Sequence, residues 1–314
     1  MNILLTGATG FVGSRLADLL LHRTSHQLTS AVRRQGTVVC GQEVVVDSLN
    51  ADTDWSKALL SQEVVIHAAA RAHVMSDQAS DPIEEYRKVN VEGTLNLARQ
   101  SVESGVKRFV YISSIKVNGE QTAPGRPFTE RDALAPSDPY GVSKMEAEEG
   151  LMELARNTEL EVVIVRPPLV YGPGAKGNFA SMLNLVTRQL PLPLGSVNNK
   201  RSLVALDNLV DLIITCVEHP AAANQVFLVS DGQDVSTTEL FRAVARAMGK
   251  SSRLLPIPAS VLVIGAAVLG KKAVAQRLLG SLQVDISKAR DLLDWEPPLT
   301  LEEGLFKAVE RHVD

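Results

Sequence analysis

This 314-residue chain has few cysteines and no excess of positive charge. Its two cysteines, Cys40 and Cys216, form no CxxC pair and no Cys/His cluster, which indicates a reducing compartment and predicts no metal site. The formal net charge of −4 gives no general attraction to polyanions, so we expect no nucleic acid partner and only local phosphate binding. With 45% hydrophobic and 22% charged residues, the composition excludes disordered and fibrous classes.

Apolar runs long enough to span a membrane are missing as well. The chain starts MNILLTG, without the basic and apolar regions of a signal peptide, so we expect a cytoplasmic protein. The apolar segment 257–270, IPASVLVIGAAVLG, is shorter than the roughly 20 residues that a helix needs to cross a bilayer. We predict a buried helix there and no integral membrane segment. The nearby Lys271, Lys272 and Arg277 leave open a peripheral contact with an anionic membrane surface.

Strand and helix patterns alternate through the first half of the chain. A helix is predicted at 11–21, and another begins after Asp81, with Pro82 at its first position and Glu84 three residues after the cap. Repeated units of this kind predict an α/β Rossmann fold, a doubly wound parallel sheet with helices on both faces. The predicted strands are 2–6, 27–32, 43–47, 64–68, 108–113 and 160–166.

After about residue 167 the composition changes. Proline and glycine gather in RPPLVYGPGAKG and LPLPLGSVNN, and capping boxes at Ser236–Glu239 and Thr300–Glu303 predict two helix starts. We therefore expect a dinucleotide-binding Rossmann domain at 1–166 and a smaller C-terminal α/β substrate domain at 167–314, with chain crossings back to the first domain allowed.

A glycine motif, Gly7-Ala-Thr-Gly10-Phe-Val-Gly13, stands between the first strand and the first helix. Glycines there let the backbone turn tightly and approach a pyrophosphate, whose charge lies at the helix N-terminus. In such folds an acid about 20 residues further on selects NAD, but this chain has Arg33 and Arg34 at that place. Guanidinium groups suit a 2′-phosphate, which favours NADP(H); the alternative is a pair of solvated loop arginines.

Two further groups of residues suggest a site. Asp47, followed by Ser48, comes at the end of the third predicted strand and is a candidate contact for the adenine edge. In Tyr140-Gly-Val-Ser-Lys144 a helical spacing of four places the ammonium near the phenol, which should lower the pKa of Tyr140 and make it an acid/base, although such pairs also arise by chance. Serines at the end of a strand, Ser113 and Ser114, could share a substrate proton.

Together with VIHAAA at 65–70, Asn90 in NVEGT and RPPLVYGP at 166–173, these motifs resemble the extended short-chain dehydrogenase/reductase family, also called the NAD-dependent epimerase/dehydratase family. The resemblance covers nearly the whole chain and is strongest to nucleotide-sugar enzymes of the UDP-galactose 4-epimerase and UDP-4-ketohexose reductase kind. It implies a UDP-linked hexose substrate and a homodimer formed by the helix near Asp81 and the helix that carries Tyr140.

The resemblance also assigns roles to residues. It implies that Ser114, rather than Ser113, is catalytic together with Tyr140 and Lys144. Arg277 is the arginine nearest to Ala275, where a second diphosphate contact is expected. The implied cofactor contacts are Gly7, Gly10, Phe11, Val12, Ala68, Ala70, Tyr140, Lys144 and Pro167, and the implied substrate contacts are Ser114, Asn178, Arg201 and Arg277.

Departures from the family pattern narrow the reaction. Dehydratases of this family need an Asp-Glu pair after the strand-end hydroxyl, whereas this chain has Ile115 and Lys116, which excludes water elimination. Leu282, preceded by Ser281, stands where the epimerases limit the C2 substituent, so an N-acetyl group is expected to fit. With NADP(H) favoured and NAD(H) the alternative, we expect a UDP-4-keto-6-deoxy-(N-acetyl)hexose 4-reductase of surface polysaccharide biosynthesis. The alternatives are a UDP-glucose/UDP-N-acetylglucosamine 4-epimerase and a non-catalytic dinucleotide sensor.

Overall fold

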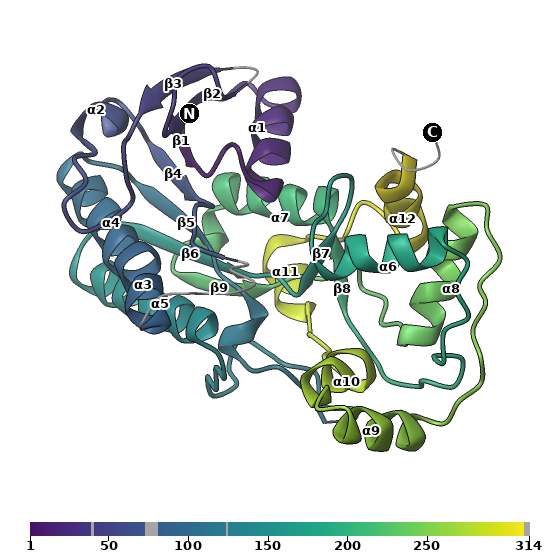
Figure 1. Cartoon of the computed structure of the whole chain (residues 1–314). Coiled ribbons are helices and arrows are strands. Elements are labelled where there is room, and N and C mark those ends of the chain that lie inside the picture. The colour runs from purple at the N-terminus through teal and green to yellow at the C-terminus, as the bar shows by residue number, and fades with distance from the viewer. Residues whose placement is uncertain (39–40, 73–80, 124, 311–314) are drawn as a thin grey trace.

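The computed structural model describes residues 1–38, 41–72, 81–123 and 125–310, so Cys40 lies outside the described residues (Figure 1). The strands are β1 (Asn2–Thr6), β2 (Gln27–Val32), β3 (Gln42–Val45), β4 (Val64–His67), β5 (Arg108–Ile112), β6 (Glu161–Arg166), β7 (Leu169–Tyr171), β8 (Leu203–Ala205) and β9 (Gln225–Leu228). The α-helices are α1 (Phe11–Arg23), α2 (Ser56–Leu59), α3 (Pro82–Arg87), α4 (Gly93–Glu103), α5 (Pro139–Asn157), α6 (Asn178–Thr187), α7 (Leu206–Glu218), α8 (Thr237–Ala247), α9 (Ala259–Val268), α10 (Lys272–Leu279), α11 (Ser287–Leu293) and α12 (Leu301–Val309). A π-helical turn η1 (Lys88–Glu92) and two 3-10 turns, η2 (Ile115–Val117) and η3 (Pro220–Ala222), complete the described elements.

A seven-stranded parallel sheet forms the centre of the molecule, in the order β3-β2-β1-β4-β5-β6-β9. The Rossmann fold class predicted from the sequence is confirmed, and the predicted strands agree with β1 to β6 to within one or two residues. Because the strands are parallel, their carboxyl ends, and the loops that follow them, all lie along one edge. Every motif of the first 166 residues follows one of these strand ends or lies in the helix next to it.

Successive side chains of a strand point to opposite faces of the sheet, and both faces are covered. Ile3 and Leu5 of β1 join the core on the side of α1 and α7, while Leu4 joins the core on the side of α4 and α5. All three are fully buried. Figure 1 shows these two helical layers on either side of the strands. This arrangement explains why strands such as β4 are apolar at nearly every position.

The residues after 167 build a second core and also complete the first. β7 and β8 form a small parallel sheet, with α6, α8 and α12 packed around it. The chain then returns to the large sheet as β9. Both predicted capping boxes are present, Ser236 with Glu239 at the start of α8 and Thr300 with Glu303 at the start of α12.

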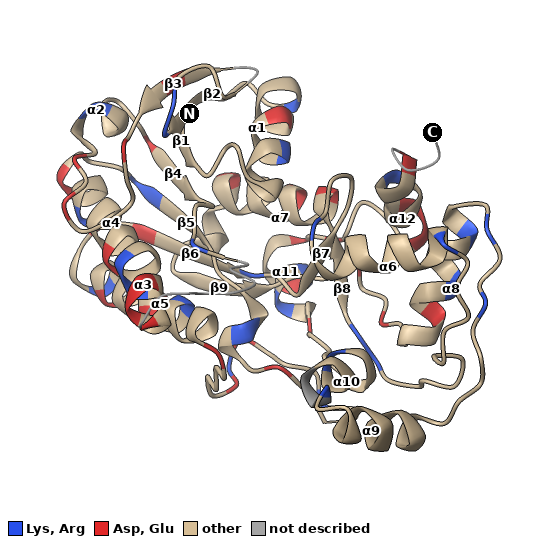
Figure 2. Ribbon diagram, viewed as in Figure 1, with Lys and Arg blue, Asp and Glu red and all other residues tan. Residues whose placement is uncertain are grey.

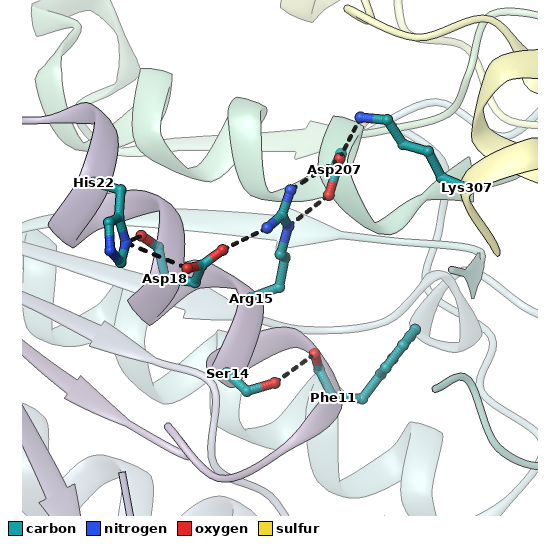
Figure 3. A network of polar contacts seen from close by, with 7 residues as sticks. All are labelled: Phe11, Ser14, Arg15, Asp18, His22, Asp207 and Lys307. Carbon is teal, nitrogen blue, oxygen red and sulfur yellow. Dashed lines mark hydrogen bonds and ion pairs between the residues drawn. The ribbon is translucent and has the colours of Figure 1, made fainter. Parts of the chain in front are cut away.

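An ion-pair network joins the glycine-loop helix to the second half of the chain (Figure 3). Arg15 of α1 donates to both carboxylate oxygens of Asp207 on α7, at 2.7 and 3.2 Å. Lys307 of α12 reaches the same carboxylate at 2.9 Å, and Asp18 also pairs with Arg15. Three helices from distant parts of the sequence are therefore held together behind the glycine loop.

The helix at 257–270 is where the fold departs most from expectation. A helix forms there as α9, but none of its residues is buried, so the prediction of a buried helix is wrong. Burial was inferred from apolar composition alone, and composition does not say whether another element is available to cover a helix. Within the described residues, no helix combines the length and the apolar character that crossing a membrane would require.

Candidate active site

The glycine loop connects β1 to α1 in a shape that only glycine permits at two positions. Gly7 has a φ of +75°, and a Cβ there would lie 2.7 Å from the backbone nitrogen of Ala69. A Cβ on Gly13 would lie 2.1 Å from the carbonyl oxygen of Gly7. The N-terminal turn of α1, with Gly10, Phe11 and Val12, is thereby left open for an anion, because the first N–H groups of a helix have no intrahelical acceptors. This cradle fits the pyrophosphate of a dinucleotide.

The end of β4 passes next to this loop, and a buried histidine holds it there. The Nδ1 atom of His67 lies 2.7 Å from the hydroxyl of Thr6 on β1, and its Nε2 atom lies 3.0 Å from the hydroxyl of Thr94 on α4. Burial, reinforced by the charge of Lys144, lowers the pKa of His67 to about 3, so the ring stays neutral. Ala68 and Ala70 follow directly and are half-buried. This link was not predicted, because its only signal in the sequence is one polar residue at the end of an apolar strand.

Tyr140 and Lys144 lie one helical turn apart at the start of α5, as the spacing predicted. Asp138 caps the helix, and its carboxylate accepts a hydrogen bond from the backbone N–H of Gly141 at 2.6 Å. The ammonium of Lys144 donates to the carbonyl oxygen of Ile112, the last residue of β5, at 2.8 Å. It also lies 6.0 Å from the centroid of the Tyr140 ring. The helix that carries the Tyr/Lys pair is thus attached to the strand end that precedes the two serines.

Of these serines, Ser114 has the more accessible side chain. Ser113 is buried, whereas Ser114 is half-buried and caps the turn η2 by accepting from the N–H of Lys116 at 3.3 Å. Pro167, just after β6, lies against the same turn, because its carbonyl oxygen accepts from the N–H of Ile115 at 2.9 Å. The ends of β5 and β6 therefore bring Ser114 and Pro167 together.

The electrostatics of the Tyr/Lys pair differ from the expectation. Burial lowers the pKa of Lys144 from its ordinary value of 10.5 to about 7, although the carboxylate of Glu148 opposes that shift. Burial, together with the charge of Asp138 and the neighbouring Tyr86, raises the pKa of Tyr140 above its ordinary value of 10. The expected lowering is wrong for this structure, because burial disfavours the charged phenolate and the negative charge of Asp138 acts in the same direction.

Two buried contacts that the sequence analysis did not find position α5. Glu148 forms an ion pair with Arg166 at the end of β6, and Arg166 also donates to Asn118 at 3.0 Å. On the other side, the π-helical turn η1 presents Asn90, whose amide nitrogen lies 3.0 Å from the hydroxyl of Ser143. That hydroxyl in turn donates to the carbonyl oxygen of Tyr140 at 2.8 Å. Wide turns of this type are frequent at functional sites.

Arg33 and Arg34 lie at the end of β2 with exposed side chains. The loop after them is fixed by Glu43, whose carboxylate accepts from the N–H groups of Gly36, Thr37 and Val38 at 2.6 to 3.0 Å.

The neighbouring strand brings two more predicted residues to the same sheet edge. Asp47 and Ser48 follow β3, are exposed, and lie beside the end of β2, since the N–H of Val46 donates to the carbonyl of Val32 at 2.8 Å. The residues predicted to contact the 2′-phosphate, Arg33 and Arg34, therefore lie at the same edge of the sheet as Asp47, which is predicted to contact adenine.

Apart from Ser114, the predicted substrate residues lie in the second half of the chain. Asn178 is exposed at the first position of α6. The guanidinium of Arg201 donates to the carbonyl oxygens of Arg277 and Gly280 at 2.8 and 3.1 Å, so the two arginines belong to one local structure. Burial lowers the pKa of Arg201, and the groups of Arg277 and Gly280 that accept from its guanidinium are backbone carbonyl oxygens rather than carboxylates. A half-buried cation of this kind favours an anionic ligand.

Comparison with known proteins agrees with this arrangement. A model of the NAD dependent epimerase/dehydratase family matches residues 3–230. A protein of Vibrio cholerae named UDP-glucose 4-epimerase is 52% identical over 310 residues, which are 98% of this chain and 94% of that relative. The solved structure of UDP-glucose 4-epimerase from Thermotoga maritima with UDP-glucose has a TM-score of 0.78 and 25% identity, and 99% and 98% of the two chains are covered. RMD from Pseudomonas aeruginosa, complexed with NADPH, has a TM-score of 0.77 and 22% identity over 100% of both chains, a likeness of fold alone.

Proposed function

Because the chain belongs to the NAD-dependent epimerase/dehydratase family, we propose that it is an enzyme acting at C4 of a UDP-hexose and that its reaction is 4-epimerisation. The observation that carries the proposal is the 52% identity to the Vibrio cholerae UDP-glucose 4-epimerase across 98% of this chain. The epimerase alternative is therefore better supported than the reductase that the sequence analysis favoured. We assign residues 1–166 mainly to the cofactor and residues 167–314 mainly to the sugar nucleotide.

The glycine loop holds the pyrophosphate of the cofactor, with Ala68, Ala70 and Pro167 beside the rest of the dinucleotide. The cofactor supplies hydride exchange at C4. On the substrate side, Asn178, Arg201 and Arg277 bind the uridine diphosphate. Guanidinium groups suit this role because they form charge-assisted bonds with phosphate oxygens.

Tyr140 moves the proton of the 4-hydroxyl. It takes that proton as C4 is oxidised and gives it back as the carbonyl is reduced, so one residue serves as base and then as acid. Lys144, four residues further along α5, stabilises the phenolate between the two steps through its positive charge. Ser114 donates a hydrogen bond to the same substrate oxygen, where charge develops.

The test is to incubate the protein with UDP-glucose and NAD and to separate the sugar nucleotides by anion-exchange chromatography. UDP-galactose should appear without net formation of NADH. The same experiment with the 2-acetamido sugar nucleotides asks whether the site admits an N-acetyl group, as expected from Leu282 at the position that limits the C2 substituent. Consumption of NADPH in proportion to a UDP-4-keto-6-deoxyhexose, with no epimerisation, would replace the proposal by the 4-reductase.

One observation keeps the 4-reductase as the second candidate. Arg33 and Arg34 stand where an acid would select NAD, and a reductase that draws on a free cofactor pool benefits from NADPH. Replacing both by alanine should then weaken NADPH binding roughly ten- to a hundredfold, the worth of a charge-assisted bond, and leave NADH binding unchanged. The double variant of the exposed Arg156 and Arg188 to alanine removes the same charge elsewhere and serves as the control. Equal effects on both cofactors would show that the arginines do not contact the 2′-phosphate.

We also propose a homodimer in which α5 and its neighbouring helices meet those of a second copy. Gly150 of α5 already lies so close to α4 that a Cβ there would be 2.7 Å from the Leu95 side chain, so the two helices form one tight pair. Two such pairs would make a four-helix interface. Light scattering at micromolar concentration should give twice the mass of the chain, and a monomer would contradict the proposal.

A further inference from the structure

An apolar helix lies uncovered at the end of the molecule far from the glycine loop. No residue of α9 is buried, and its side chains Val263, Ile264 and Val268 are 51%, 65% and 82% exposed. Among the residues of α9, Leu262 is the one that packs against the second core. Figure 1 shows α9 at the edge of the fold, with α10 between it and the remaining elements.

The uncovered surface extends beyond α9 on both sides. Leu255 before the helix is 48% exposed, Leu269 after it is 71% exposed, and Val274 of α10 is 50% exposed. Globular proteins seldom leave such groups of large apolar side chains in water without a binding partner. We call this set the α9 surface, and it consists of Leu255, Val261, Val263, Ile264, Val268, Leu269 and Val274.

The chain segment that carries the α9 surface has charges of a single sign. Residues 240–284 contain no Asp or Glu, although the whole chain has a net charge of −4. Figure 2 shows α9 without a charged residue along its length and basic residues on the neighbouring α10. Arg253 and Lys271 are exposed next to the α9 surface, and Arg277, which the proposed function assigns to the uridine diphosphate, is exposed as well. The side chain of Lys272 lies outside the described part of the structure. The basic residues of the segment are Arg242, Arg246, Lys250, Arg253, Lys271, Lys272 and Arg277.

We propose that the α9 surface docks peripherally on an anionic lipid bilayer. A helix of ten residues is about 15 Å long, half the thickness of the hydrocarbon core, so α9 lies in the plane of the interface. Its outward arc is apolar apart from Ser260, which suits disordered acyl chains, and the basic residues beside it face anionic headgroups. A second copy of this chain would bring the same positive charges face to face across a twofold axis, which disfavours it as the occupant.

The docking surface is attached to the part of the chain where the substrate residues lie. The last carbonyl groups of α10 and the following glycine accept hydrogen bonds from three side chains: Arg201 to Arg277 at 2.8 Å, Asn199 to Gly280 at 2.8 Å, and Thr237 to Leu278 at 2.6 Å. Docking through α9 therefore places Arg201 and its neighbours toward the membrane and leaves the glycine loop on the far side. The proposal itself rests on exposure and charge and does not depend on the reaction catalysed.

The experiment is flotation of the full chain with vesicles of phosphatidylcholine alone or mixed with phosphatidylglycerol. The protein should float with the anionic vesicles at low salt and not with the zwitterionic ones. The variant Ile264→Glu with Val268→Glu should lower the bound fraction by about tenfold or more, since two apolar side chains no longer enter the lipid. The variant Arg253→Glu with Lys271→Glu should also bind less, and its residual binding should depend less on salt.

The matched control is Leu60→Glu, because Leu60 is a 75% exposed apolar residue in another part of the fold. It should float like the unsubstituted protein. Unchanged melting temperatures would show that the substitutions leave the fold intact, as their exposure suggests. Absence of binding to anionic vesicles, or equal binding by the Ile264/Val268 variant, would overturn the proposal. So would a loss of dimer mass in light scattering on the same substitutions, which would assign the α9 surface to a second copy.

Discussion

Glu148 and Arg166 form an ion pair in which both side chains are almost completely buried, at 3% and 4% exposure. Glu148 lies one helical turn after Lys144 on α5, and Arg166 ends β6 immediately before Pro167. The pair therefore joins the helix that carries Tyr140 and Lys144 to the strand end beside the predicted cofactor site.

Breaking this pair should be costly. Glu148→Gln leaves Arg166 buried without a counter-charge and should lower the free energy of unfolding by about 3–5 kcal/mol. Urea unfolding measures the change. Glu149→Gln, at the exposed neighbouring position, is the control and should have little effect. The double variant Glu148→Leu with Arg166→Met should recover much of the loss. Equal stability of Glu148→Gln and Glu149→Gln would show that the pair does not hold α5 in place.

Lys144 should make stability depend on pH. Burial lowers its pKa from 10.5 to about 7, so between these values the unfolded chain binds a proton that the folded protein has released. Stability contributed by this residue must then rise with pH across that window. We expect Lys144→Met to be more stable than the unsubstituted protein at about pH 7 and to lose that advantage toward about pH 10. Urea unfolding of the nucleotide-free proteins measures both. A difference that stays constant with pH would contradict the lowered pKa.

Tyr140→Phe should abolish most turnover without harming binding. The change removes only the hydroxyl, so the rate should fall roughly 10²- to 10⁴-fold, the usual contribution of a positioned acid/base. Dissociation constants for NAD and UDP-glucose, measured by calorimetry, should stay nearly unchanged. The control is Tyr86→Phe, which removes the hydroxyl of the neighbouring ring. The ring centroids of Tyr86 and Tyr140 lie 6.1 Å apart in an edge-on arrangement, and this variant should keep nearly full activity. Full activity of Tyr140→Phe would mean that another group moves the proton.

Gly13→Ala should destroy the glycine loop. The added methyl group would lie 2.1 Å from the carbonyl oxygen of Gly7, so the backbone has to move and the pyrophosphate cradle opens. Cofactor binding should be lost, as measured by calorimetry, and the melting temperature should fall. The control is Gly265→Ala, where a Cβ meets nothing within 4 Å. Normal cofactor affinity of Gly13→Ala would place the dinucleotide elsewhere.

Most of the fold could be predicted because it depends on short-range patterns. Apolar runs gave the strands, and Asp81, Ser236 and Thr300 gave helix starts through capping that involves residues three positions away. Long-range contacts could not be predicted from short-range patterns. The residues next to His67 do not indicate a contact with Thr6, and those next to Glu148 do not indicate an ion pair with Arg166.

The two wrong expectations have a common cause. The pKa of Tyr140 was inferred from Lys144 alone, without the burial of the phenol or the charge of Asp138. The burial of α9 was inferred from its own residues, without asking which element would cover them. In both cases the surrounding residues decide the result, the pKa of Tyr140 or the burial of α9. Neither residue spacing nor local composition carries information about those surroundings.

The position of β9 bears on how this protein folds as it is made. Until residue 228 has left the ribosome, β6 is an edge strand whose backbone groups lack their neighbour, although five of its six side chains are buried in the finished protein. Helix α7, which covers α1, also comes late. A nascent chain that ends near residue 166 therefore exposes the unpaired edge of β6 and the apolar side of α1, both of which favour aggregation. Parallel pairing between segments that are distant in the sequence is also slow. The protein is expected to need protection from aggregation until β9 has paired with β6. The first 166 residues produced alone should aggregate.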